Sequence, residues 1–96
     1  MATKMRKLEI TTRFKKDARI AKKRGLDITK LDAVINSLLS DEILPDKLAD
    51  HALSGEYHGH RECHIEPDWL LIYLKNDDGL VLTAVRTGSH SDLFKQ

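Results

Sequence analysis

The chain lacks residues and segments on which several protein classes depend. Cys63 is the only cysteine among 96 residues, which excludes an intramolecular disulfide and zinc sites built from paired cysteines. The longest apolar run, WLLIYL, has six residues, whereas a membrane-spanning helix needs about 20. No apolar stretch of a secretory signal follows the basic N-terminus MATKMRK. These absences predict one small domain over 1–96 in a reducing cytoplasm, without a membrane partner.

Motifs that mark several common active sites are absent as well. The sequence contains no glycine-rich phosphate loop and no nucleophile elbow, and no residue spacing fixes a metal site. No internal repeat or low-complexity segment is present. We therefore expect no cofactor, and any catalysis has to come from side chains that transfer protons.

Charge is distributed very unevenly along the chain, although the net charge is only +1. Residues 1–30 hold eleven Lys and Arg against three Asp and Glu, while residues 31–96 hold five against twelve. Such polarity suggests a basic surface that meets an anionic partner such as a nucleic acid. The segment KKDARIAKKRG can equally be the solvated face of an ordinary helix, so charge alone leaves both interpretations open.

Hydrophobic periodicity divides the chain into helices and strands. In TTRFKKDARIAKKRG, the apolar Phe14, Ala18 and Ala21 share one helical face. The segment WLLIYLKN is apolar on both faces, which predicts a strand in the centre of a sheet or between covering layers. The expected elements are a strand over 7–11, helices over 11–25 and 27–41, a long connection over 44–59, strands over 60–66, 69–76 and 80–87, and a short helical tail over 88–94.

Helix termini and element order predict the fold class. Thr11 or Thr12 is the expected N-cap of the first helix, and Gly25 the residue that ends it. Thr29 and Asp32 resemble a capping box in the second helix. The order predicts an α+β fold, with a mostly antiparallel four-stranded sheet, two N-terminal helices on one face and a short C-terminal helical tail. The other face would be concave and open to solvent.

Polar side chains gather beside the most apolar strand, in the segment HRECHIEPDW. Burial of such groups is costly unless they are paired, so this segment is either an exposed strand edge or a working site. Histidine exchanges protons near neutral pH, and Asp68, Glu62 and Glu66 could orient it. Arg86 offers a charged fork for a phosphate. This set suits metal-free RNA cleavage by attack of the ribose 2′-OH on the adjacent phosphate. The histidines are His51, His58, His60, His64 and His90.

Most of these residues also have an ordinary structural interpretation. His58, His60 and His64 share strand parity, and H-x-H spacing on a strand can ligate zinc, although no fourth ligand is fixed by spacing. Trp69 is typical of a core anchor as well as of a base-stacking platform. Arg86 at the end of a strand could be a surface ion-pair partner.

Three motifs resemble those of a known family. The stretches DHALSG, RECHIEPDWLLIY and VRTGSHSDLF are similar to the C-terminal half of the YafQ-type toxins, in the RelE/ParE superfamily of bacterial type II toxin–antitoxin modules. The resemblance is strong over 50–94 and looser upstream. It implies a RelE-like fold and a ribosome-dependent endoribonuclease that cuts mRNA and is silenced by a cognate antitoxin.

The resemblance also implies site residues. The family's active-site positions fall here on His51, His64, Asp68, Arg86, His90 and Phe94, with Trp69 inside the motif. His90 is expected to act as general acid, with His64 and Asp68 together on the base side. His51 would support the ribose or serve as the alternative base, and Arg86 would bind the scissile phosphate. Phe94 and Trp69 would pack the mRNA bases or the wall of the site. His58 and His60 lie outside the pattern, which weakens the zinc interpretation.

The implied partners are a cognate antitoxin, the 30S subunit with its 16S rRNA, and mRNA. The toxin alone is expected to be a monomer that becomes oligomeric with its antitoxin. Two alternatives share parts of the pattern, a ParE-like toxin that inhibits DNA gyrase without catalysis and a small zinc-binding or RNA-binding module. The basic residues expected to bind ribosomal RNA are Lys15, Lys16, Arg19, Lys22, Lys23 and Arg24.

Overall fold

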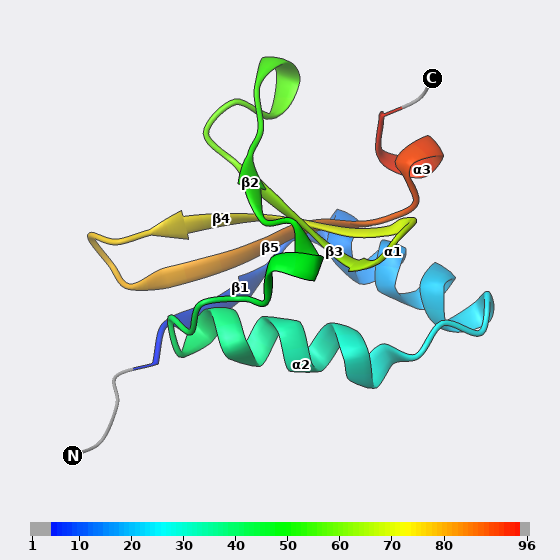
Figure 1. The fold of residues 1–96 in the computed structure, drawn as a ribbon, viewed down its shortest axis with the longest axis horizontal. Coiled ribbons are helices and arrows are strands. Elements are labelled where there is room, and N and C mark those ends of the chain that lie inside the picture. The colour runs from blue at the N-terminus through cyan, green and yellow to red at the C-terminus, as the bar shows by residue number, and fades with distance from the viewer. Residues whose placement is uncertain (1–4, 95–96) are drawn as a thin grey trace.

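The computed structural model describes residues 5–94, and the remaining residues of the expected 1–96 domain lie outside the described part. It is an α+β fold (Figure 1). The elements are β1 (Lys7–Ile10), α1 (Thr12–Lys23), α2 (Ile28–Leu39), the 3₁₀ turn η1 (Asp46–Leu48), β2 (His51–Ala52), the 3₁₀ turn η2 (Gly55–Tyr57), β3 (Arg61–Glu66), β4 (Trp69–Asn76), β5 (Val81–Gly88) and α3 (His90–Phe94).

The sheet has five strands in the order β1-β5-β4-β3-β2, and it is mixed. β1 runs parallel to β5, with Lys7 opposite Val81, and the other pairs are antiparallel. Three of the four strand pairs are therefore antiparallel, as expected, whereas the expected number of four strands is wrong. β2 adds a fifth strand of only two residues, which pairs His51 with Glu62. Such a short segment has no detectable periodicity of its own.

The caps of α1 and α2 are formed by residues close to those expected. The Thr11 hydroxyl accepts the Phe14 N–H at 2.9 Å and donates to the Val85 carbonyl at 2.7 Å, so the N-cap also attaches α1 to β5. In α2 the N-cap is Asp27, whose carboxylate accepts the Thr29 N–H at 3.0 Å. The expected capping box at Thr29 is therefore wrong, because Thr29 lies inside the first turn of α2 and Asp27 is the N-cap.

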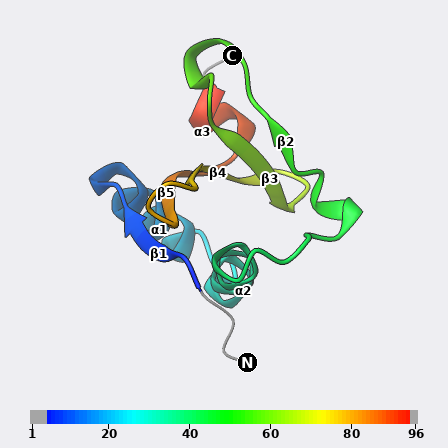
Figure 2. The same ribbon diagram turned by 90° about the vertical axis from the view of Figure 1, so that its left-hand side faces the viewer.

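Apolar side chains pack on both faces of the sheet. On one face α1 and α2 bury a core with Cys63, Leu71 and Leu82. On the opposite face Leu70 and Ile72 are fully buried by α3 and by the segment around η2. Figure 2 shows α3 across the sheet from α2. β4 is thus the central strand, as its two-faced pattern predicts, and the second face is not open as expected. None of the helices between residues 5 and 94 is long and apolar enough to cross a membrane.

Candidate active site

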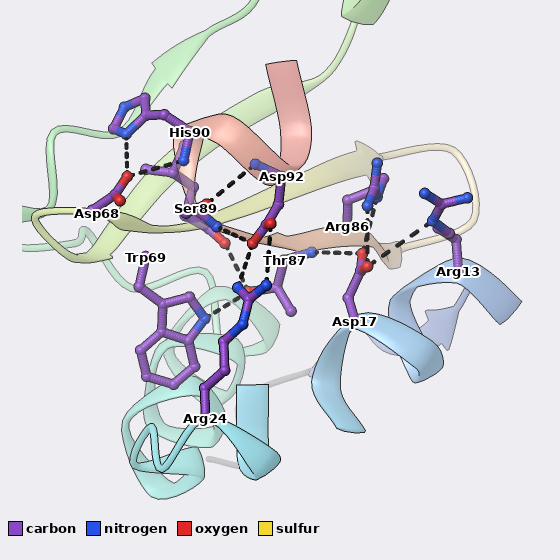
Figure 3. A network of polar contacts seen from close by, with 11 residues as sticks. Arg13, Asp17, Arg24, Asp68, Trp69, Arg86, Thr87, Ser89, His90 and Asp92 are labelled. Atoms are coloured by element: carbon purple, nitrogen blue, oxygen red, sulfur yellow. Dashed lines mark hydrogen bonds and ion pairs between the residues drawn. The ribbon is translucent and has the colours of Figure 1, made fainter. Parts of the chain in front are cut away.

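A histidine and a carboxylate meet where the β3–β4 turn approaches the start of α3. His90 Nδ1 lies 2.6 Å from Asp68 Oδ1, and the His90 backbone N–H donates to the same oxygen at 2.9 Å (Figure 3). Both side chains are at least half exposed. Among the described residues the hydrogen-bonding partner of Asp68 is therefore His90, whereas the resemblance groups Asp68 with His64 on the base side.

The contact with His90 determines the ionisation of Asp68 and the orientation of the imidazole. The His90 backbone N–H, and then its side chain, hold the pKa of Asp68 below its usual value. Asp68 is therefore a carboxylate at neutral pH, and it accepts the proton on Nδ1. An imidazole fixed in this way presents Nε2 as the atom that exchanges protons.

The short helix α3 is held in place by a reciprocal cap. The Ser89 hydroxyl accepts the Asp92 N–H at 3.1 Å, and the Asp92 carboxylate accepts the Ser89 N–H at 3.0 Å. This is a capping box with Asp in place of Glu. The preceding Gly88 permits the close approach, since a Cβ atom there would lie 3.0 Å from Asp92.

Two further histidines continue from His90 along the second face. The ring centroids of His64 and His90 lie 5.6 Å apart, and those of His51 and His64 lie 6.3 Å apart. The Oε1 atom of Glu62 lies 3.4 Å from His51 Nε2 and 3.5 Å from His64 Nε2. Glu62 is 4% exposed, and its buried Oε2 has no hydrogen-bonding partner among residues 5–94. Glu62 is therefore the carboxylate that lies between these two imidazoles.

Arg86 forms a buried ion pair that the sequence does not reveal. Its Nε and Nη2 atoms donate to the two oxygens of Asp17 at 2.9 and 3.0 Å, and the side chains of Arg86 and Asp17 are 14% and 7% exposed. Asp17 also accepts the Thr87 N–H at 3.2 Å. Hydrogen bonding to Asp17 is the main cause that raises the pKa of Arg86. One feature of the sequence could have indicated a partner for Asp17, because this charged residue shares the buried face of α1 with Phe14 and Ala21.

Arg86 and Phe94 line a cleft beside α3, together with Arg13 and Tyr57, with a volume of about 460 Å³. The Phe94 and Tyr57 rings meet edge to face with centroids 6.0 Å apart. The three histidines are not among the residues that line this cleft. The structure thus brings His51, His64, Asp68 and His90 together, and it places Arg86 and Phe94 in a neighbouring cleft.

The remaining predicted residues fall in different places. Trp69 is 2% exposed, and its indole N–H donates to the Thr87 hydroxyl at 2.9 Å. Its ring is therefore part of the core and is not available to stack on an RNA base. His58 and His60 lie at and after the end of η2. Within residues 5–94 no three His, Cys, Asp or Glu side chains are grouped so as to hold a metal ion.

The basic residues predicted to bind ribosomal RNA are exposed, but Arg24 differs from the others because it forms an ion pair. Lys15, Lys16, Arg19, Lys22 and Lys23 lie on the exposed part of the helix. Arg24, which follows it, binds Asp92 of α3 at 2.6 Å. The basic surface of α1 is defined here by those five residues, without Arg24.

Comparisons with known proteins agree on one family. The family model described as "Bacterial toxin of type II toxin-antitoxin system, YafQ" matches residues 6–95. The mRNA interferase toxin YafQ of Escherichia coli K12 is 39% identical over 90 residues, covering 93% of this chain and 96% of that protein.

Solved structures give the same result. The E. coli DinJ–YafQ complex superposes with a TM-score of 0.85 at 39% identity, over 93% of this chain and 98% of that chain. A metal-bound toxin from Helicobacter pylori superposes with a TM-score of 0.88 at 40% identity, over 94% and 100% of the two chains.

Proposed function

This chain belongs to the YafQ family of toxins from bacterial type II toxin–antitoxin systems, and from that premise we propose that it is an mRNA interferase. As an endoribonuclease it cuts mRNA on the ribosome, with the ribose 2′-OH as nucleophile and protein side chains as the acid and base. The observation that carries the proposal is the His90–Asp68 contact, at 2.6 Å.

His90 is the proposed general acid. Asp68 stays ionised because the pKa of its carboxyl is lowered by His90. It accepts the proton on Nδ1, so a ring that acts as an acid carries its second proton on Nε2. The proton on Nε2 can then pass to the 5′-oxygen as the P–O bond breaks. Asp68 orients the imidazole and does not take the proton itself, as in other carboxylate–histidine pairs.

The proposed general base is His64 or His51. The 2′-OH has to lose its proton while its oxygen attacks phosphorus, and a neutral imidazole can accept that proton. Glu62 Oε1 lies within 3.5 Å of Nε2 of both rings, so either imidazole can be oriented by this carboxylate. His64 stands between His51 and His90, next to the proposed acid.

Arg86 is the proposed phosphate ligand. A guanidinium has five N–H donors, and Asp17 occupies one on Nε and one on Nη2. Three donors are left for the phosphate oxygens, which gain negative charge in the transition state. Because Arg86 lines the cleft with Phe94, the bases that flank the cut would lie there.

The basic surface of α1 is the proposed ribosome contact. Its five cations are exposed together on one helix, and such a surface binds the phosphates of ribosomal RNA with release of counterions. The other proposed partner is a cognate antitoxin, as in the DinJ–YafQ complex. The gyrase-inhibiting alternative is not favoured, because the curated relative is an mRNA interferase and a non-catalytic inhibitor needs no acid–base cluster.

The test is cleavage of mRNA on purified translating ribosomes by His90→Ala, with His58→Ala as a matched control. His58 is an exposed histidine outside the cluster, so its loss leaves cleavage unchanged. Loss of a general acid slows cleavage by about 10²–10⁴-fold. Wild-type rates in His90→Ala would refute the assignment. Inhibition of supercoiling by gyrase, without mRNA cleavage, would refute the proposed activity as a whole.

A further inference from the structure

The residue that ends α1 is joined to the helix that carries His90. Arg24 Nη1 and Nη2 lie 2.6 and 3.3 Å from the two oxygens of Asp92, which stands 68 positions later in the chain. Figure 3 shows the Arg24 guanidinium reaching the Asp92 carboxylate beneath Ser89. An arginine that meets a carboxylate through two nitrogens is held in one orientation.

The Asp92 carboxylate has two roles at once. It accepts the Ser89 N–H that closes the cap of α3, and it binds Arg24. The pKa of Asp92 lies well below its usual range. The larger cause is the hydrogen bond from Arg24, and the second is the hydrogen bond from the Ser89 N–H. One ionised side chain therefore both starts α3 and attaches it to α1.

Helix α3 needs such attachments because it has only five residues, and a helix of that length is not stable alone. Inside the helix Leu93 is buried at 6% exposure, and at its first residue His90 contacts Asp68. The pair with Arg24 is the link from α3 to α1, the helix whose exposed face carries the basic surface.

We propose that Arg24 is a positioning residue for cleavage, because its ion pair with Asp92 holds α3 so that His90 stays against Asp68 with Nε2 turned to the substrate. The inference rests on the proposed function of His90. It assigns to Arg24 a role different from that of its neighbours Lys22 and Lys23, whose charges are free to meet RNA. It also joins the proposed ribosome-binding helix to α3, the helix that begins with the proposed acid.

The two roles predict different kinetics. A cation that only binds RNA changes the ribosome concentration at half saturation, whereas a positioning residue changes the rate at saturation. We expect Arg24→Ala to lower the saturating cleavage rate about five- to tenfold, as expected when a pair of this kind no longer holds a reacting group in place. The half-saturating ribosome concentration should stay within about twofold of wild type.

Three further variants make the test specific. Asp92→Asn keeps an acceptor for the Ser89 N–H but removes the charge, so it should match Arg24→Ala. Arg24→Lys keeps the charge and should retain most of the rate. Lys23→Ala is the matched control, since it removes an exposed cation one residue away, and it should raise the half-saturating concentration with little effect on the saturating rate.

NMR of the free toxin gives a readout that is independent of activity. The ring resonances of His90 should change in Arg24→Ala, while those of His58 stay the same. An unchanged His90, or a higher half-saturating concentration with an unchanged saturating rate, would overturn the inference. If the His90 resonances change as expected but the wild-type protein does not cleave mRNA, the proposed function fails while the positioning contact stands.

Discussion

Removal of the Asp17 carboxylate should destabilise the protein strongly, although Asp17 is one of fifteen acidic residues. The change Asp17→Ala breaks two charge-assisted hydrogen bonds to Arg86, at 2.9 and 3.0 Å, and one to the buried Thr87 N–H, at 3.2 Å. Removing one partner of a buried ion pair costs about 3–5 kcal/mol, because the other charge is left without a partner.

The magnitude should fall at the lower end of that range. Arg86 is 14% exposed and lines an open cleft, so water can solvate part of the guanidinium. We therefore expect a loss of about 3 kcal/mol in the free energy of unfolding. With an m-value of about 1.5 kcal/mol/M, the midpoint of urea unfolding should fall by about 2 M.

A double-mutant cycle makes the assay specific to the pair. The loss in Asp17→Ala/Arg86→Ala should be smaller than the sum of the single losses, because the double variant leaves no unpaired charge at this place. Asp32→Ala, which removes an exposed carboxylate from α2, should change stability by less than about 0.5 kcal/mol. If the free energy of unfolding of Asp17→Ala lies within about 0.5 kcal/mol of the wild-type value, the ion pair with Arg86 does not stabilise the fold as predicted.

The remaining predictions use other measurements. Asp68→Asn should slow mRNA cleavage about 10²-fold or more, because the amide no longer fixes the orientation and tautomer of the His90 ring; normal single-turnover rates would contradict this. Charge reversal at Lys22 and Lys23 should weaken ribosome binding and reduce its salt dependence, which filter binding at several salt concentrations can measure. Burial raises the pKa of the fully buried Cys63 thiol to about 12, so iodoacetamide should label the native protein at pH 8 only as fast as it unfolds. Arg6 lowers the pKa of Asp41, so the stability from this pair is present above about pH 4 and should decline as acid protonates the carboxyl; Asp41→Asn should flatten the decline seen in acid unfolding curves.

The parts of the fold that depend on neighbouring residues could be predicted from the sequence. The two-faced apolar pattern of 69–76 indicates a central strand, and β4 lies there. Thr11 was one of two expected N-caps and is the one observed. These features follow from the periodicity and side-chain chemistry of contiguous residues.

The parts that depend on remote partners could not be predicted. β1 pairs in parallel with β5, about 74 positions away, and no local pattern specifies which distant strand a short strand will join. Arg86 was predicted to face a phosphate, but two of its five N–H donors bind Asp17, 69 positions earlier. The charge of Arg24 was likewise assigned to RNA, and its contact with α3 emerges only when both helices are in place.

The position of β5 between β1 and β4 has a consequence for how the protein is made. β5 is the last strand among the described residues, yet α1 packs against it and β1 pairs with it. During synthesis, Phe14 of α1 therefore cannot pack against β5 until residues 81–88 have left the ribosome. The native contacts of β1 and α1 with the sheet therefore depend on a segment that is synthesised about 70 residues later.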